Sequence, residues 1–367
     1  MSNKKFGHFI NGEQNITSQL VENLSPSDVT DVVGLYASGD GLQTNDAISA
    51  ANDALASWSQ SSPQVRADIL DKAGNEILAR KEELGKLLSR EEGKTLPEGI
   101  GEATRAGQVF KFFAGEALRQ KGDLFASIRP GIDIEVTREP AGVIGIITPW
   151  NFPIAIPAWK IAPALAYGNT VVFKPAELVP GCSWEIVDIL HRAGLPAGVL
   201  NLIMGKGRIV GQSIIDSPNV NAISFTGSVN TGKMIAECCA KSFKKIQLEM
   251  GGKNPLVILD DADLDNAVDC AINGAFFSTG QRCTASSRFV VTGGIHDAFV
   301  SACIKKLSAL KTGHALEPDT HIGPVVNLSQ LEQDIKYISL GQEEGAKLAF
   351  GGSRPDRKHD GFYLEPA

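Results

Sequence analysis

Apolar residues recur at three- and four-residue spacing among charged ones from about residue 44 to residue 121. This spacing places them on one face of a helix, so the segment is predicted to form amphipathic helices. The first 50 residues are mixed and rich in turn-forming stretches such as SPSDVTD and SGDG. After the helical segment, the short runs DLFASIRP and GIDIEVTREP flank Pro130-Gly131 and predict a β-hairpin.

From residue 142 onward, short apolar runs rich in β-branched residues alternate with helical segments of ten or more residues. The runs are GVIGIIT (142–148), TVVFKP (170–175), VLNLIMG (199–205), AISFTG (222–227), KIQLEMGG and PLVILDD. This alternation predicts an α/β fold with a parallel, Rossmann-type sheet that is covered by helices on both faces.

The stretch FTGSVNTGKM, residues 225–234, resembles the phosphate-binding loop of nucleoside triphosphatases, with Gly227, Gly232 and Lys233 at the required spacing. That loop needs Ser or Thr after the lysine to hold Mg²⁺, but Met234 follows here, and its thioether is a poor ligand for a hard cation. A triphosphatase is therefore disfavoured. A helix N-terminus at the carboxyl edge of a parallel sheet still binds anions, which leaves the phosphates of a dinucleotide as the expected ligand.

Composition narrows the classes of partner. The chain has 367 residues, enough for two domains or one large α/β domain, and a formal net charge of −7 with no long basic run. Nucleic acid and anionic membranes are therefore not expected partners. The N-terminus lacks the apolar core of a signal peptide, and no stretch is long and apolar enough to span a bilayer, so we expect a cytoplasmic protein.

No metal site is predicted. The six cysteines form no C-x-x-C pair, and the six histidines are scattered. Asp261, Asp263 and Asp265 have the spacing of a calcium loop, but Asn266 stands where that loop needs glycine and Ile272 where it needs a carboxylate. Acidic residues at a helix N-terminus explain this run better.

Three residues are candidates for chemistry. Cys283 lies in the polar loop STGQRCTASSR beside Arg282, which could stabilise a thiolate, although many cysteines are simply small buried residues. Glu249 ends an apolar strand in QLEMGGKNP, where a carboxylate could cap a turn, pair with a lysine or belong to an active site. Asn151 lies between two prolines in TPWNFP, where its amide could satisfy the turn or donate to an oxyanion.

Taken together, these motifs resemble aldehyde dehydrogenases. TPWNFP, FKPAE, FTGS, LEMGGKNP and GQRC occur in the order and at the spacing of that family, over nearly the whole chain. Within the family, LSPSDVTDVVGLYA and GQRCTASSR resemble bacterial dehydrogenases of α-ketoglutarate semialdehyde (2,5-dioxopentanoate), an ω-oxo acid. Arg282 is one candidate for the cation that would hold its far carboxylate. Succinate semialdehyde and a neutral aliphatic aldehyde remain alternative substrates.

The resemblance implies a covalent mechanism for the NAD(P)-dependent oxidation of an aldehyde to a carboxylate. Cys283 would be the nucleophile that forms a thiohemiacetal, and the Asn151 amide, with the backbone N–H of Cys283, would hold the oxyanion. Loss of a hydride to the nicotinamide would leave a thioester. Glu249 would be the general base that activates water to hydrolyse the thioester.

The resemblance also implies the residues that bind the cofactor. Lys174 and Glu177 of FKPAE would hold the ribose hydroxyls of the adenosine, and the carboxylate favours NAD, with NADP possible, because it would repel a 2′-phosphate. The other implied contacts, from the adenosine ribose to the nicotinamide, are Gly207, Gly227, Ser228, Thr148, Trp150 and Met250. Trp150 could equally be a core aromatic.

The same resemblance divides the chain into residues 1–121 and 140–251 as the NAD(P)-binding domain, 122–139 as an oligomerisation hairpin and 252–367 as the catalytic domain. Family members continue beyond DGFYLEPA by on the order of a hundred residues, so the catalytic domain is expected to be incomplete and the complete chain to form homo-oligomers. One hypothesis is a dehydrogenase whose chain is cut or incompletely given; another is a truncated paralogue that binds NAD(P) or a partner. The intact catalytic residues favour the first.

Overall fold

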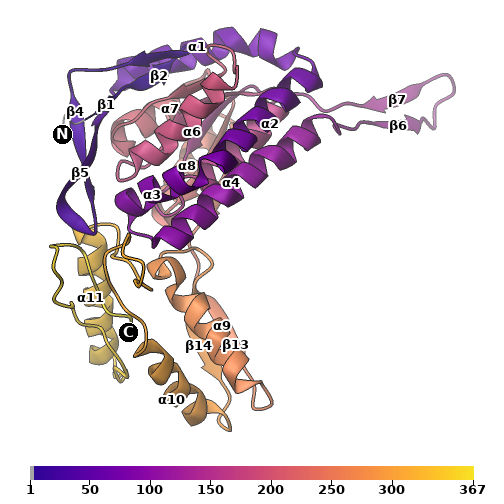
Figure 1. Cartoon of the computed structure of the whole chain (residues 1–367). Coiled ribbons are helices and arrows are strands. Elements are labelled where there is room, and N and C mark those ends of the chain that lie inside the picture. Colours follow the sequence, from indigo (N-terminus) through magenta and orange to yellow (C-terminus); the bar gives the residue numbers. More distant parts are fainter. Residues whose placement is uncertain (1–3) are drawn as a thin grey trace.

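The computed structural model describes residues 4–367, and Figure 1 shows their arrangement. A seven-stranded sheet in this part of the chain has the order β12-β11-β8-β9-β10-β2-β3. Its parallel strands are β8 (Val143–Ile147), β9 (Thr170–Lys174), β10 (Leu200–Leu202), β11 (Ala222–Gly227) and β12 (Lys245–Met250). The predicted α/β fold with a parallel sheet is therefore confirmed.

Helices cover both faces of this sheet, as the alternation of strands and helices predicts. They are α1 (Gly41–Ser59), α2 (Pro63–Ala79), α3 (Lys81–Glu92), α4 (Leu96–Ala117), α5 (Ala155–Ala166), α6 (Pro180–Arg192), the π-helical turn η1 (Gly207–Gly211), α7 (Gln212–Asp216) and α8 (Val229–Lys241). Side chains alternate along a strand, so Val171 and Phe173 of β9 join the apolar cluster under α2–α6, whereas Val172 joins the cluster under α1, α7 and α8. Both faces of β9 are thereby buried.

The N-terminal segment contains strands that its turn-rich sequence does not predict. These are β1 (Lys5–Phe6), β2 (His8–Ile10), β3 (Glu13–Asn15), β4 (Leu20–Ser25) and β5 (Asp28–Ala37). The strands β1, β4 and β5 form a separate three-stranded sheet, and β2 adds antiparallel to β10 through Phe9 opposite Leu202. The partners of β1 (β5) and of β2 (β10) are distant in sequence, so a local pattern does not record them. The pairs β2–β3 and β4–β5 are hairpins of neighbouring strands, which the sequence analysis missed.

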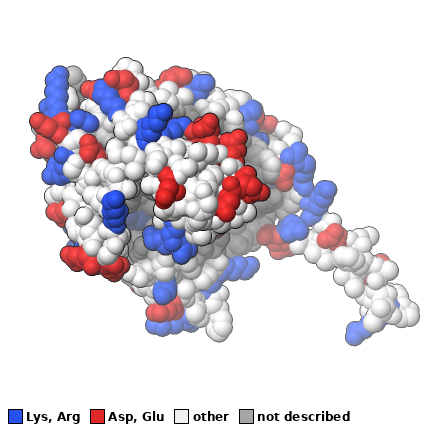
Figure 2. Space-filling view, turned by 90° about the horizontal axis from the view of Figure 1, so that it is seen from below, with Lys and Arg blue, Asp and Glu red and all other residues white. Residues whose placement is uncertain are grey.

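The β-hairpin predicted around Pro130-Gly131 is confirmed. It consists of β6 (Asp123–Ala126) and β7 (Asp133–Val136), which pair antiparallel. Figures 1 and 2 both show it extending away from the body of the molecule. On the body, acidic and basic side chains are interspersed over the face that Figure 2 displays. The role of the hairpin in oligomerisation stays a prediction.

The last third of the chain forms its own layer, which Figure 1 shows below the large sheet. Its elements are β13 (Asn254–Ile258), α9 (Leu264–Phe276), the 3₁₀ turn η2 (Phe277–Gly280), β14 (Ser286–Val291), α10 (His296–Leu307) and α11 (Leu328–Glu343). The strands β13 and β14 pair in parallel, and Ile258, Val268 and Phe299 belong to a cluster of their own. A boundary at residues 251 and 252 stays a prediction. Among the described residues, every helix is too short or too polar to cross a membrane.

Candidate active site

The loop that carries Cys283 is held in an unusual shape just before it reaches the cysteine. Ser278 and Thr279 have φ angles of 53° and 55°, a left-handed conformation that costs a residue with a side chain free energy. The backbone N–H of Ser278 donates to Glu98 Oε1 at 2.7 Å, and Glu98 also accepts from the N–H of Thr95 at 2.9 Å at the start of α4. A single carboxylate thereby ties the strained loop to the N-terminus of α4.

Cys283 and Asn151 line one cavity of about 520 Å³. The cavity lies where the loops after β8, β11 and β12 meet the Cys283 loop and α11, as expected for the carboxyl ends of parallel strands. The predicted site residues among its lining are Trp150, Asn151, Gly227, Ser228, Met250 and Cys283. The structure therefore brings together segments that are separated by more than a hundred residues of sequence.

The side chain of Asn151 is fixed against the Cys283 loop. Its Nδ2 donates to the carbonyl of Gln281, two residues before the cysteine, at 2.9 Å. Its own backbone carbonyl accepts a hydrogen bond from the ammonium of the buried Lys94. An amide NH₂ has two hydrogens, and the bond to Gln281 uses one, so the other can donate to a ligand oxygen in the cavity.

Cys283 itself is an exposed, unpaired thiol. Its backbone carbonyl accepts from Asn254 Nδ2 at 2.8 Å, and the same amide donates to the carbonyl of Ala285 at 3.2 Å. Asn254 therefore fixes the chain on the far side of the cysteine, as Glu98 does on the near side. Sequence reasoning missed both residues, although Asn254 belongs to the motif LEMGGKNP.

Glu249 lies on the edge strand β12, one residue before Met250 of the cavity lining. Its carboxylate is exposed, and its Oε1 accepts a hydrogen bond from Nε2 of Gln247 at 2.8 Å. Gln247 in turn contacts Lys160 and Ser224. Sequence reasoning missed these three residues, although a lysine inside the apolar helix IAIPAWKIAPALA was a visible signal.

Arg282 lines the cavity with Cys283, but one end of its guanidinium is engaged by the protein, and its role toward a substrate carboxylate stays a prediction. Its guanidinium donates to the carbonyls of Asn273 at 2.6 Å and Gly274 at 2.8 Å, near the end of α9, and lies 4.9 Å from the ring centroid of Phe277. Burial lowers the pKa of Arg282, while the charges of Glu98 and Cys283 raise it. The side chain acts as a cap for the last carbonyls of a helix.

The residues predicted for the adenosine end lie together beside η1. Lys174 is buried, and its Nζ is 3.9 Å from Glu177 Oε1. The backbone N–H of Gly207 donates to the same carboxylate oxygen at 3.0 Å. Burial lowers the pKa of Lys174, and the Glu177 carboxylate raises it. A Cβ atom added to Gly207 would meet nothing within 4 Å, so open space for a ligand lies next to this group.

Two buried hydroxyls at the carboxyl end of the sheet fit a polar ligand there. Thr148 Oγ1 and Thr226 Oγ1 have no hydrogen-bond partner within residues 4–367. Thr148 follows β8, and Thr226 lies on the neighbouring strand β11. Such buried polar atoms are costly unless a ligand or water satisfies them. Together with the free N–H groups at the start of α8, they fit a dinucleotide at this edge.

The glycines of the loop that resembles a phosphate-binding loop have a packing role. A Cβ at Gly227 would lie 2.5 Å from the ring of Phe225, and one at Gly232 would lie 2.4 Å from Met250 Sδ. Ser228 caps α8 by accepting from the N–H of Thr231 at 3.2 Å. The glycines therefore let the turn pack closely against its own strand and against β12.

The calcium-like run of aspartates caps a helix, as its sequence predicts. Asp263 is the N-cap of α9, and its carboxylate accepts from the N–H of Asn266 at 2.9 Å. Among the described residues, no group of three or more His, Cys, Asp and Glu side chains could hold a metal ion.

A second cavity of about 470 Å³ lies beside α4 and α5. Phe152, Trp159 and Phe277 give it aromatic walls. Lys94, in the same lining, pairs with Glu102 at 2.7 Å, whereas Arg105 makes no ion pair or side-chain hydrogen bond within residues 4–367. Sequence reasoning missed this cavity, although the spacing of Glu98, Glu102 and Arg105 places them on one face of α4.

Comparison with known proteins agrees with this geometry. The model of the aldehyde dehydrogenase family matches residues 12–367. The chain is 41% identical over 364 residues to alpha-ketoglutaric semialdehyde dehydrogenase of Bacillus subtilis. That alignment covers 98% of this chain and 75% of the relative. An NAD-dependent aldehyde dehydrogenase of Sinorhizobium meliloti superposes with a TM-score of 0.97 at 33% identity, over 99% of this chain and 73% of its own.

A betaine aldehyde dehydrogenase of Staphylococcus aureus, in complex with NAD+, superposes with a TM-score of 0.95 at 36% identity. The alignment covers 98% of this chain and 72% of that one. Both the match to the family model and these identities extend over nearly all of the chain. The protein therefore belongs to the aldehyde dehydrogenase family and is an NAD(P)-dependent enzyme of that family.

Proposed function

We propose that the protein oxidises an ω-oxo acid, with α-ketoglutarate semialdehyde as the preferred substrate, to the corresponding dicarboxylate. The observation that carries the proposal is the single cavity shared by the Cys283 thiol and the Asn151 amide. A nucleophile and an oxyanion donor that line one cavity are the two groups that acyl chemistry on an aldehyde needs first.

In this mechanism, Cys283 Sγ attacks the aldehyde carbon and the carbonyl oxygen takes up the negative charge. The free N–H of the Asn151 amide and the backbone N–H of Cys283 stabilise that oxyanion, and one such donor is worth about 3–4 kcal/mol. NAD(P)+ held at the carboxyl edge of the sheet would supply the hydride acceptor, and loss of the hydride would leave a thioester on Cys283. The Glu98 and Asn254 contacts hold the loop in place throughout.

Glu249 completes the reaction as the general base. Its carboxylate takes a proton from water, and the resulting hydroxide attacks the thioester carbon. The carbon–sulfur bond breaks, the product leaves as a carboxylate and the Cys283 thiolate is restored. Oxidation and hydrolysis thus become two separate steps on one sulfur atom.

The cofactor is assigned to the edge of the sheet where the orphan hydroxyls lie. We propose that Lys174 and Glu177 hold the adenosine ribose, beside the open space at Gly207. The remaining contacts proposed are Thr148, Trp150, Gly227, Ser228 and Met250. The Glu177 carboxylate favours NAD over NADP because a 2′-phosphate would bring like charges together.

The second cavity is assigned to the tail of the substrate. Its aromatic walls suit a short carbon chain, and the unpaired Arg105 suits a carboxylate at the far end of that chain. Succinate semialdehyde could use the same cation, whereas a neutral aldehyde could not. The relative from Bacillus subtilis is named for α-ketoglutaric semialdehyde, which favours the dicarbonyl acid.

Domain roles follow from this assignment. We propose that residues 1–121 and 140–251 bind the cofactor and that residues 252–367 present Cys283. The hairpin of residues 122–139 exposes apolar side chains, Leu124 at 78% and Ile128 at 102%, and is assigned to homo-oligomerisation. A thiol nucleophile suits a reducing cytoplasm.

The test compares purified protein and its Cys283→Ser variant, with NADH formation as the readout. We expect kcat/KM to be highest for α-ketoglutarate semialdehyde, lower for succinate semialdehyde and lowest for pentanal, and Cys283→Ser to abolish all three. Equal activity on pentanal would overturn the substrate assignment. Aldehyde oxidation that survives in Cys283→Ser would overturn the mechanism.

A further inference from the structure

A buried lysine is connected to Glu249 through hydrogen bonds on three elements. Lys160, on α5, is 6% exposed, and its Nζ donates to Ser224 Oγ at 2.8 Å and to Gln247 Oε1 at 2.9 Å. The Ser224 hydroxyl donates to the same Gln247 oxygen at 2.7 Å. Gln247 Nε2 then donates to Glu249 Oε1 at 2.8 Å.

These contacts fix the orientation of the Gln247 amide. Its oxygen receives two donors, from Lys160 and Ser224, so its NH₂ group must face Glu249. A flipped amide would set NH₂ against an ammonium and oxygen against a carboxylate. Gln247 and Glu249 are two residues apart on β12, so their side chains lie on the same face of the strand.

Lys160 is difficult to explain by stability alone. No carboxylate lies within ion-pair distance of it among residues 4–367, and an unpaired buried ammonium is costly. Burial lowers the pKa of Lys160 to about 8, and the charge of Glu249 opposes that shift. The charge of Glu249 therefore affects the pKa of Lys160 although Gln247 lies between the two groups.

We propose that Gln247 is a positioning residue for Glu249, with its amide locked by Lys160 and Ser224. The inference rests on the proposed role of Glu249 as the general base. Both Gln247 and Glu249 are exposed on the strand β12, and the bond from Gln247 is the one side-chain hydrogen bond of the Glu249 carboxylate among residues 4–367. An amide anchored to a buried lysine supplies the fixed geometry that proton abstraction requires.

The test is Gln247→Met, which keeps the length of the side chain and removes its donor. Its matched control is Gln64→Met on α2. Gln64 Nε2 also donates to a carboxylate, Asp68 Oδ1, at 2.7 Å, but this pair is distant in sequence from the site. Both proteins are assayed with 4-nitrophenyl acetate and no cofactor. The Cys283 thiolate displaces 4-nitrophenolate and forms an acetyl thioester, which water then hydrolyses with Glu249 taking the proton.

For Gln247→Met we expect the initial burst of 4-nitrophenolate to stay within about twofold of wild type and the steady-state rate to fall on the order of tenfold. Gln64→Met should change neither phase. Ser224→Ala, a milder change, should show the same split with a smaller fall. A parallel loss of burst and steady state in Gln247→Met would indicate a folding defect rather than positioning, and would overturn the inference.

A double variant separates action through Glu249 from any other effect. In a Glu249→Gln background, Gln247→Met should reduce the steady-state rate by less than about twofold, because the group it positions is already gone. A further tenfold loss there would overturn the inference. If Cys283→Ser keeps a burst of the same size as the wild-type protein, the proposed function is overturned instead. If the wild-type protein shows the burst and Gln247→Met has the same burst and the same steady-state rate, the positioning role alone is refuted.

Discussion

The Glu98 carboxylate on α4 accepts a hydrogen bond from the backbone N–H of Ser278 at 2.7 Å, across 180 residues of sequence. Ser278 and Thr279 are both in the left-handed region, so this contact holds a backbone that would otherwise relax. The loop it holds leads to Cys283. The position of the nucleophile therefore depends on a residue that belongs to a distant helix.

We expect Glu98→Ala to release this loop. The change removes both the bond to Ser278 and the cap on the Thr95 N–H, so the free energy of unfolding should fall by about 1–3 kcal/mol. The rate of Cys283 alkylation by iodoacetamide should also change, because the thiol loses its fixed surroundings. Urea denaturation and alkylation kinetics measure the two effects.

The control is Glu82→Ala, in the first turn of α3. Unchanged alkylation in a destabilised Glu98→Ala protein would contradict the link to Cys283.

The second cavity predicts a specificity residue. Arg105→Met should raise KM for α-ketoglutarate semialdehyde about 10- to 100-fold, because an arginine–carboxylate contact contributes about 1.5–3 kcal/mol. Pentanal has no carboxylate, so its kcat/KM should change less than about twofold. The control variant Lys86→Met removes an exposed cation from α3. Equal losses on both substrates would show that Arg105 shapes the cavity rather than binding the carboxylate.

The sequence predicts those parts of the site that depend on residues close together in the chain. The β8 strand and the motif TPWNFP lie together in the chain, so the position of Asn151 at a strand end follows from the sequence. Lys160, Ser224 and Gln247 could not be found in this way, because they meet only after α5, β11 and β12 have packed, 64 and 87 residues apart in sequence. Arg282 is next to Cys283 in sequence and in the cavity, but its bonds to the carbonyls of Asn273 and Gly274 near the end of α9 were not visible in the sequence.

The same reasoning explains why β1 was not predicted. β1 is only two residues long, and its Lys5 and Phe6 pair with Leu35 and Tyr36 of β5, about thirty positions away. No periodicity can build up over two residues. By contrast, the apolar face of α4 extends over 22 residues, and the spacing of its buried positions was visible in the sequence.

Glu92 predicts a dependence of stability on pH. It is fully buried at the end of α3, and burial raises its pKa to about 8, with Lys94 lowering it and Glu102 and Glu98 raising it. The folded state therefore keeps a proton that the unfolded state releases above its ordinary pKa. This contribution is complete below the unfolded pKa and is lost as pH rises through the folded pKa, by roughly 1 kcal/mol for each pH unit between 6 and 8.

Glu92→Gln mimics the protonated form and should remove this decline. The free energy of unfolding of the variant, relative to that of wild type, should increase between pH 6 and pH 8 in urea titrations. Glu82→Gln, at the exposed start of the same helix, should leave the wild-type pH profile unchanged. A constant difference between Glu92→Gln and wild type over this interval would show that Glu92 is ionised in the folded protein.

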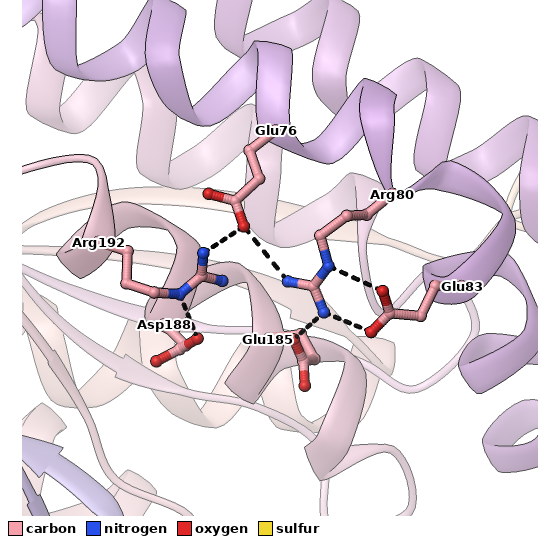
Figure 3. A network of polar contacts seen from close by, with 6 residues as sticks. All are labelled: Glu76, Arg80, Glu83, Glu185, Asp188 and Arg192. Carbon is pink, nitrogen blue, oxygen red and sulfur yellow. Dashed lines mark hydrogen bonds and ion pairs between the residues drawn. The ribbon is translucent and has the colours of Figure 1, made fainter.

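A network of charged residues joins α2, α3 and α6, as Figure 3 shows. Arg80 contacts Glu76 at 3.4 Å and Glu185 at 2.8 Å, and it also pairs with Glu83. The bond to Glu83 is the largest of the effects that raise the pKa of Arg80. Arg192 shares Glu76 from the other side and binds Asp188 as well. One arginine thus ties together three helices that cover the same face of the sheet.

We expect Arg80→Met to lower the free energy of unfolding by about 1–2 kcal/mol. This loss is larger than that from removing an isolated surface ion pair, because the side chain of Glu185, which is 14% exposed, is left without its cation. The matched control is Arg119→Met, whose pair with Glu116 lies within one helical turn and whose own side chain is 61% exposed. That variant should lose less than about 0.5 kcal/mol. Urea denaturation at low salt and at 1 M NaCl measures both, and the effect of Arg80→Met should shrink at high salt because its more exposed contacts are screened. Equal losses in the two variants would show that the network adds nothing beyond its separate pairs.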